Sequence, residues 1–313
     1  MTRALVFPGQ GSQAVGMGRD LAGAFASARR TFEEVDEALH QNLSRLMFEG
    51  PESELTLTEN AQPALMAASL AVMRVLEGDG GLDLKRQVAF VAGHSLGEYS
   101  ALAAAHALSV PDAARLLKRR GRAMQKAVPV GIGAMAALLG LDLEPARAVA
   151  AEAAQSEICT CANDNGPGQV VVSGHRVAVE RAITVAGEHG ARRAILLAVS
   201  APFHCPLMLP AAEEMAEALA DIALAEPLVP LVANVSARPE RDPDDIRRLL
   251  VAQVTGLVRW RECVLAMRAA GVDQIVEIGA GRVLSGLVKR IDREIATAAV
   301  GAPAEIETFL KTL

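Results

Sequence analysis

The chain has 313 residues, of which 51% are hydrophobic and 22% charged, a composition typical of a globular protein with a sizeable core. Its formal net charge is −6 and only 3% of its residues are aromatic, which argues against nucleic-acid binding, because phosphates need a basic face and bases need stacking platforms. It has no run of 18 or more apolar residues, so we expect no transmembrane helix and no membrane partner.

Short apolar runs alternate with helical patterns over the first part of the chain, which predicts α/β architecture. The first residues are typical of a strand and a turn rather than of a signal peptide. Strands are expected at 3–7 and 88–92, and helices at 20–39, 61–77, 96–108 and 111–126.

The stretch from 128 to 199 has a different pattern. Strands are expected at 134–141, 158–162, 169–173 and 193–199, helices at 144–155 and 177–189, and a turn at 163–168. The order β-α-β-β-α-β is that of a ferredoxin-like unit. We therefore predict a ferredoxin-like small domain at 128–199, inserted into a large α/β domain formed by 1–127 and 200–313. In the large domain a helix is expected at 210–220 and strands at 229–234 and 274–277.

The strongest local motif is Gly93-His94-Ser95-Leu96-Gly97, which lies between an apolar strand and a helix. It fits G-x-S-x-G, in which glycines allow the tight turn that exposes a nucleophilic serine. The following helix N-terminus supplies free N–H groups for an oxyanion, and that of Leu96 is the natural donor. The alternative is a strand-to-helix junction that needs glycines only for its turn, with the serine as an N-cap.

Two further glycine motifs are weaker indications of function. Gly9 to Ala14 formally matches the dinucleotide-binding G-x-G-x-x-A, but no acidic residue ends a second strand about 20 residues later. The segment 276–281 is similar to a methyltransferase motif but lies too near the C-terminus. We interpret the turn at 8–13 instead as the source of a second oxyanion donor, the backbone N–H of Gln10.

A serine nucleophile needs a base. The six histidines are His40, His94, His106, His175, His189 and His204. His94 adjoins the serine, so its side chain should point away from that of Ser95, and the others except His204 lie on polar helix faces or ends. His204 follows a strand, in a loop between two prolines, where catalytic residues often occur. A packed or capping histidine is the alternative, and no carboxylate stands out as its partner.

Several motifs together resemble one family, the malonyl-CoA:acyl-carrier-protein transacylases of bacterial fatty acid synthesis. They occur at 7–13, 62–65, 93–98, 120–121, 200–204 and 277–281. The resemblance implies a hydrolase-like α/β core with a mostly parallel sheet. It also implies that Ser95 carries the acyl group, that His204 is its base, and that the backbone carbonyl of Gln253 orients the histidine.

The same resemblance implies the substrate contacts. Arg120 would form a salt bridge with the free carboxylate of malonyl, while Gln62 and Phe203 would complete the substrate pocket. Backbone N–H groups of Gln10 and Leu96 would form the oxyanion hole. The implied reaction transfers malonyl from malonyl-CoA to acyl carrier protein and needs no metal or redox cofactor.

The carrier protein is expected to be acidic, so exposed cations are candidates for docking it. They are Arg119, Arg122, Lys126, Lys289 and Arg290. Lys118, Arg119 and Arg122 are otherwise expected to form a solvated basic face. The four scattered cysteines predict no disulfide framework and no zinc site, which favours a reduced, cytoplasmic protein.

Three alternatives remain at this point. The same serine and histidine could deliver the acyl group to water as an acyl-thioester hydrolase. The acceptor could be a carrier protein of polyketide synthesis or of a malonate decarboxylase. The chain could also be a nucleotide-binding module built on residues 9–14.

Overall fold

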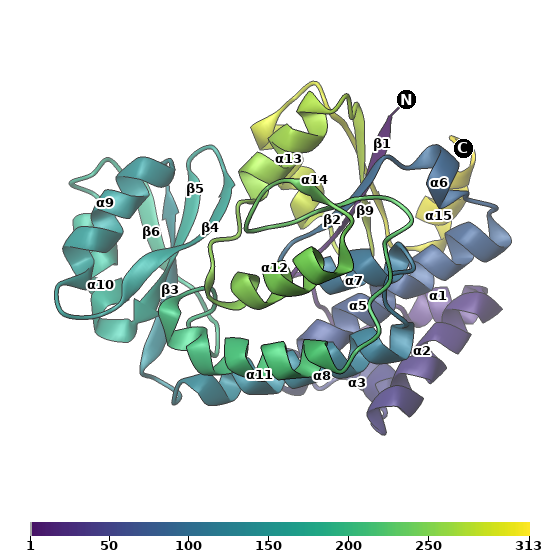
Figure 1. Ribbon diagram of the computed structural model, residues 1–313, viewed down its shortest axis with the longest axis horizontal. Coiled ribbons are helices and arrows are strands. Elements are labelled where there is room, and N and C mark those ends of the chain that lie inside the picture. Colours follow the sequence, from purple (N-terminus) through teal and green to yellow (C-terminus); the bar gives the residue numbers. More distant parts are fainter. Residues whose placement is uncertain (1) are drawn as a thin grey trace.

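Two β-sheets of different construction organise the protein, whose computed structural model describes residues 2–313 (Figure 1). The larger sheet has the strand order β10-β9-β1-β2-β7-β8, and all its neighbours are parallel except β7 and β8. Its strands are β1 (Arg3–Phe7), β2 (Phe90–Gly93), β7 (Leu231–Val232), β8 (Pro239–Glu240), β9 (Gln274–Ile278) and β10 (Ala296–Val300). The predicted α/β class with a mostly parallel sheet is confirmed.

Helices surround this sheet. They are α1 (Arg19–Ala24), α2 (Ala26–Leu39), α3 (Leu43–Glu49), α4 (Glu52–Leu55), α5 (Thr58–Arg74), α6 (Leu84–Gln87), α7 (Gly97–Ala104), α8 (Val110–Ala127), α11 (Leu209–Ala220), α12 (Pro243–Thr255), α13 (Trp260–Ala269), α14 (Val283–Ile291) and α15 (Pro303–Leu310). A π-helical turn, η1 (Val75–Asp79), extends α5, and a 3₁₀ turn, η2 (Pro206–Met208), precedes α11. None of the helices within residues 2–313 combines the length and apolarity that crossing a bilayer would require.

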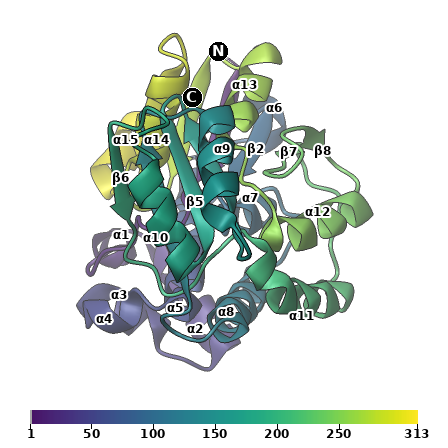
Figure 2. The same cartoon turned by 90° about the vertical axis from the view of Figure 1, so that its left-hand side faces the viewer.

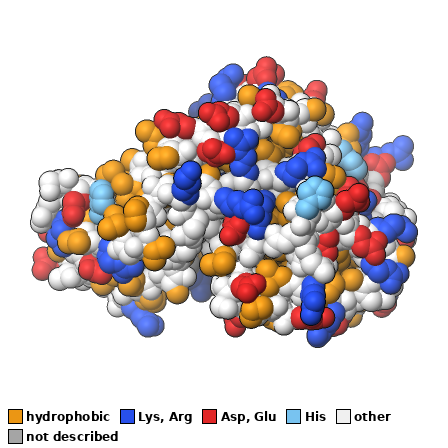
Figure 3. All heavy atoms as spheres, turned by 90° about the horizontal axis from the view of Figure 1, so that it is seen from below, with side chains coloured by type: hydrophobic (Ala, Val, Ile, Leu, Met, Phe, Trp, Pro, Cys, Tyr) orange, Lys and Arg blue, Asp and Glu red, His pale blue; other side chains and the backbone are white. Residues whose placement is uncertain are grey.

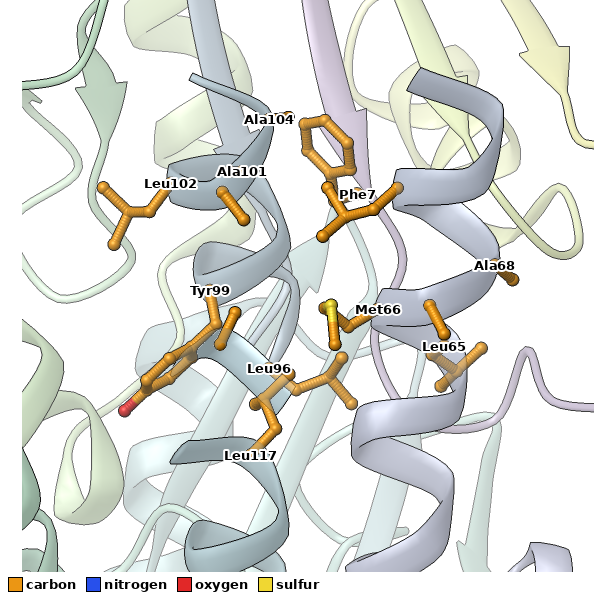
Figure 4. Close-up of a cluster of buried hydrophobic side chains, with 14 of the residues drawn as sticks. Phe7, Leu65, Met66, Ala68, Leu96, Tyr99, Ala101, Leu102, Ala104 and Leu117 are labelled. Carbon is orange, nitrogen blue, oxygen red and sulfur yellow. The ribbon is translucent and has the colours of Figure 1, made fainter. Parts of the chain in front are cut away.

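The core beneath the C-terminal ends of β1 and β2 is built from α5, α7 and α8 (Figure 4). Phe7, Met66, Leu96 and Leu117 are all fully or almost fully buried there. Burying one such side chain stabilises the fold by about 1.5–3 kcal/mol. The segments that carry residues 8–10 and 94–96 therefore stand on a tightly packed base.

The smaller sheet forms a lobe at one end of the molecule, seen face-on in Figure 2. Its strands, β3 (Gly133–Leu139), β4 (Cys159–Gly166), β5 (Gln169–His175) and β6 (Arg193–Leu196), are antiparallel in the order β4-β5-β3-β6. Helices α9 (Leu143–Ala154) and α10 (Arg176–Val185) pack on it around an apolar cluster of its own. This is the predicted β-α-β-β-α-β order, with the strand arrangement of a ferredoxin-like unit.

The largest differences between the structure and the sequence prediction lie in three segments. The helix expected at 20–39 is two helices, because Phe25 is extended between α1 and α2. The turn expected at 163–168 is mostly strand, because residues 163–166 pair with β5 and only 167–168 lie outside the two strands. The Asp164 N–H also donates to the carbonyl of Val258. The strand expected at 229–234 is the two-residue β7.

Candidate active site

Ser95 lies on the sharp turn between β2 and α7, with the left-handed φ of +55° that such a turn requires of its central residue. The two glycines of the motif are dictated by close backbone contacts. A Cβ on Gly93 would lie 1.9 Å from the carbonyl carbon of Gly97, and a Cβ on Gly97 would lie 2.3 Å from the carbonyl oxygen of Phe7. Any side chain at either position would therefore displace the turn or the neighbouring strand.

Ser95 and His204 meet although they are 109 residues apart in sequence. The Ser95 Oγ lies 2.8 Å from Nε2 of His204, and the Nδ1 of that ring lies 2.8 Å from the backbone carbonyl oxygen of Gln253. A carbonyl can only accept, so Nδ1 carries the hydrogen and Nε2 is left to accept the serine proton. A serine hydroxyl, a base and an orienting acceptor are thus aligned without a carboxylate beside the histidine.

The histidine is held in its neutral form. Burial and, to a smaller extent, the nearby charge of Arg120 together lower the pKa of His204 to about 3, against an opposing effect of the Gln253 carbonyl. His204 is only 4% exposed. A neutral imidazole is the form that can take a proton from the hydroxyl.

Arg120 of α8 points to the same hydroxyl from the other side. Its side chain is 1% exposed, and Nη2 donates to the Ser95 Oγ at 3.1 Å and to Oε1 of Gln253 at 2.8 Å. Nη1 donates to Oε1 of Gln62 at 2.7 Å, while Nε is buried without a partner among residues 2–313. Within the described chain no Asp or Glu forms an ion pair with this guanidinium. The site therefore holds a buried positive charge with room for an anionic partner.

The two residues whose backbone N–H groups are expected to bind an oxyanion lie at an open cavity. Gln10 and Leu96 both line it, and neither N–H donates to any acceptor within residues 2–313. The side chain of Gln10 is fixed by Thr58, whose Oγ1 donates to Oε1 of Gln10 and accepts from Nε2 of Gln62, both at 2.9 Å. One chain of hydrogen bonds thus links the Gln10 turn to Gln62 and on to Arg120.

The cavity has a volume of about 350 Å³ and lies between the two lobes. Phe203, 8% exposed, forms part of its wall next to His204. From the small lobe the lining residues are Met135, Asn163, Asn165, Val171, Leu197, Ala198 and Val199. All eight residues predicted for the site therefore converge on one place, although Gln253 does so from behind Ser95, through its contacts with Arg120 and His204.

The comparisons with known proteins agree with this geometry. The family model described as an acyl transferase domain matches residues 4–304. The chain belongs to this acyl transferase family. It is 47% identical to the malonyl CoA-acyl carrier protein transacylase of Bacillus subtilis, over 99% of this chain and 96% of that one, and 45% identical to that of Escherichia coli, over 98% of each.

Solved structures give the same picture of the acyltransferase. The acyl-carrier-protein S-malonyltransferase of Bartonella henselae superposes with a TM-score of 0.97 at 55% identity, covering 100% of this chain and 99% of the other. A malonyl-transacylase in complex with a type II polyketide-synthase acyl-carrier protein superposes with a TM-score of 0.96 at 46% identity, covering 100% of both chains.

The structure of the acyltransferase also reveals polar residues around the serine that sequence reasoning missed. The Ser95 N–H donates to Oδ1 of Asn234 at 2.8 Å, and Asn234 Nδ2 donates to the carbonyl of Gly93 at 2.7 Å. Glu98, buried behind them, accepts from the N–H of Asn234 at 2.6 Å. Glu98 is part of the motif at 93–98, so the sequence could have indicated it. Asn234 lies in no recognisable motif, so the sequence could not.

Of the other histidines, only His94 is in the cavity wall among residues 2–313. His94 lines the cavity, and its Nε2 lies 2.8 Å from Oδ1 of Asn165 in the small lobe. His106 and His189 pair with glutamates on the surface, and His175 Nδ1 accepts from the N–H of Ile158. Among residues 2–313 no group of three or more His, Cys, Asp or Glu could hold a metal ion, and all four cysteines are free.

The basic face predicted on α8 is only partly solvated. Lys118 is 8% exposed, with Nζ 2.8 Å from Oδ1 of Asn60 and 3.2 Å from a carboxylate oxygen of Glu59, so its assignment to solvent was wrong. It is buried because α8 packs closely on α5. Arg119 pairs with Glu214 and Arg122 with Glu59, whereas Lys126 and Lys289 form no ion pair with the described residues. On the face shown in Figure 3, charged side chains of both signs are scattered among hydrophobic and other side chains.

Proposed function

We propose that this acyltransferase moves the malonyl group of malonyl-CoA to the phosphopantetheine thiol of an acyl carrier protein, through a malonyl ester on Ser95. The pathway it would serve is fatty acid biosynthesis. The observation that carries the proposal is Arg120, a buried guanidinium that contacts the hydroxyl of Ser95 and has no carboxylate partner among residues 2–313.

A buried, unpaired charge is costly, and a ligand that supplies the opposite charge recovers that cost. Arginine suits a carboxylate because its planar fork donates two parallel hydrogen bonds. Its distance of 3.1 Å from the Ser95 Oγ limits the ligand to an acyl group with a carboxylate close to its carbonyl. Malonyl, with one methylene between these groups, fits that requirement, and acetyl leaves Arg120 unpaired.

The reaction would proceed in two half-reactions. His204 takes the proton of Ser95 as its Oγ attacks the thioester carbon, and the oxyanion accepts from the N–H groups of Gln10 and Leu96. The C–S bond then breaks, and the protonated His204 returns the proton to the leaving thiolate. In the second half, His204 deprotonates the carrier thiol, whose sulfur attacks the ester carbon; the C–O bond to Ser95 breaks, and His204 returns the proton to the Ser95 Oγ.

The proposed chemistry uses only these side chains and N–H groups, with no metal or redox cofactor. We place the enzyme in the cytoplasm, where thiols stay reduced and its four free cysteines would remain so. A carrier protein of polyketide synthesis is the second candidate acceptor, because one of the similar structures is a transacylase bound to such a protein.

Intact-mass measurement after mixing with malonyl-CoA tests the proposal. We expect a malonyl adduct that is absent in Ser95→Ala and is discharged by holo-acyl carrier protein. Holo-carriers from fatty acid and polyketide systems, compared at equal concentration, identify the preferred acceptor. Absence of the adduct in the wild-type enzyme contradicts the proposal, and rapid loss of the adduct to water without any thiol selects the hydrolase instead.

A further inference from the structure

Glu98 is a buried carboxyl group that the chemistry described above does not use. It lies in the first turn of α7, three residues after Ser95, and is 1% exposed. A buried carboxylate has to be satisfied by donors. One oxygen accepts from the backbone N–H of Asn234 at 2.6 Å, and the other accepts from Nε2 of Gln253.

Gln253 connects this carboxyl to the substrate side of the site. Its Nε2 also donates to the carbonyl of Ser95 at 2.9 Å, and its Oε1 accepts from Nη2 of Arg120 at 2.8 Å. The amide therefore has a required orientation, with its oxygen toward Arg120 and its nitrogen toward Glu98. An ionised carboxylate can only accept, so it holds the NH₂ group on its own side and leaves the oxygen for the guanidinium.

The second branch from Glu98 reaches the backbone of the nucleophile turn. Asn234, fixed by Glu98 through its N–H, accepts from the Ser95 N–H at 2.8 Å through its side chain. The same carboxyl thus supports the serine on one side and the arginine on the other. Only the branch through Gln253 leads to Arg120, so an effect on malonyl that spares acetyl reports this branch.

We propose that Glu98 is a positioning residue that fixes the amide of Gln253, holds the fork of Arg120 where the malonyl carboxylate binds, and thereby sets the preference for malonyl over acetyl. This inference rests on the proposed function. Burial raises the pKa of Glu98 to about 8, against the opposing effects of its two hydrogen bonds and of Arg120, so the acceptor form gains population as pH rises through that value.

The decisive variant is Glu98→Gln, assayed at about pH 8.5, above the pKa of the wild-type carboxyl. A glutamine replaces one of the two acceptor oxygens by an NH₂ group. If this NH₂ group lies next to Asn234, it faces another donor, the N–H of Asn234. If it lies next to Gln253, the amide of Gln253 has to turn its own NH₂ group toward Arg120. The ratio of kcat/KM for malonyl-CoA to that for acetyl-CoA should fall at least about 10-fold, since one charge-assisted hydrogen bond at Arg120 is lost or misplaced.

Acetyl loading serves as the internal control, because it needs the serine turn but not the arginine. An equal loss for both substrates would mean that Glu98 supports only the turn, and no loss for either substrate would mean that it positions neither the turn nor Arg120. Either result overturns the proposal. Glu277→Gln is the matched control variant: Glu277 is also fully buried and accepts N–H groups at the start of α14, so this change should alter stability and leave the ratio unchanged.

Gln253→Leu tests the same connection between Glu98 and Arg120 at the residue that joins them, and it does so whether or not Glu98→Gln folds. It removes the side-chain amide and keeps the backbone carbonyl that accepts from His204. We expect the malonyl preference to fall in this variant as well, and a preserved preference would refute the link. Failure of the proposed function would look different, because the wild-type enzyme itself would then form no malonyl adduct.

Discussion

Replacing Arg120 by alanine removes the group on which the proposed selectivity depends. In the structure its guanidinium is 1% exposed, contacts the Ser95 Oγ, and pairs with no acidic residue of the described chain. A malonyl carboxylate would accept two charge-assisted hydrogen bonds from it, each contributing about 1.5 kcal/mol. Together these amount to about 3 kcal/mol, which corresponds to about a 150-fold loss in kcat/KM for malonyl-CoA.

Acetyl-CoA carries no carboxylate, so its kcat/KM should stay within a few-fold of the wild-type value. The assay is the rate of CoA release in the presence of holo-acyl carrier protein, measured for both thioesters. Arg115→Ala is the control, because Arg115 lies on the same helix and pairs with Asp112 at the surface. Equal losses for malonyl and acetyl in Arg120→Ala would refute the assignment of the carboxylate to this arginine.

Three further predictions follow from other parts of the structure. Because burial and the charge of Arg120 hold the pKa of His204 near 3, kcat/KM for acetyl-CoA, whose loading does not use Arg120, should stay level as pH falls from about 8 to about 5, and an inflection near 6.5 would contradict this. Gly93→Ala should lower the free energy of unfolding by about 3 kcal/mol or more in urea titrations, because its Cβ would overlap the backbone of Gly97. The control Gly286→Ala, whose Cβ meets nothing within 4 Å on α14, should not destabilise the protein. Lys289→Glu should raise the KM for an acidic carrier protein several-fold and leave that for malonyl-CoA unchanged.

The nucleophile turn was predictable from sequence because its requirements are local. A strand, two glycines around a serine and a following helix specify the turn within nine residues, and the structure places Ser95 there. His204 could be narrowed to a loop between prolines but not paired with Ser95 by any spacing rule. The resemblance to a known family supplied that pairing, and the same is true of Gln253, whose contribution to the histidine is a backbone carbonyl.

The errors arose where a distant segment decides the local structure. Asn163 and Asp164 are typical turn residues, yet they continue β4, because they pair with Val171 and Val170 of β5 and are further held by the distant backbone at Val258. Lys118 has the spacing of a solvated position, but α5 covers it and supplies Asn60 and Glu59 as partners. Hydrogen bonds between segments far apart in sequence leave no pattern in composition or periodicity, which is also why Asn234 was missed.

The position of Arg120 links substrate selectivity to the strength of the base. Burial lowers the pKa of His204 first, and the positive charge of Arg120 lowers it further. A bound malonyl carboxylate neutralises that charge, so the imidazole becomes a stronger base when the proposed substrate is present. Acetyl brings no such charge and leaves the histidine as weak a base as in the free enzyme. The acid limb of kcat, which reports the enzyme–substrate complex, should therefore lie at higher pH for malonyl-CoA than for acetyl-CoA, and identical limbs would show that Arg120 selects the substrate without affecting its base.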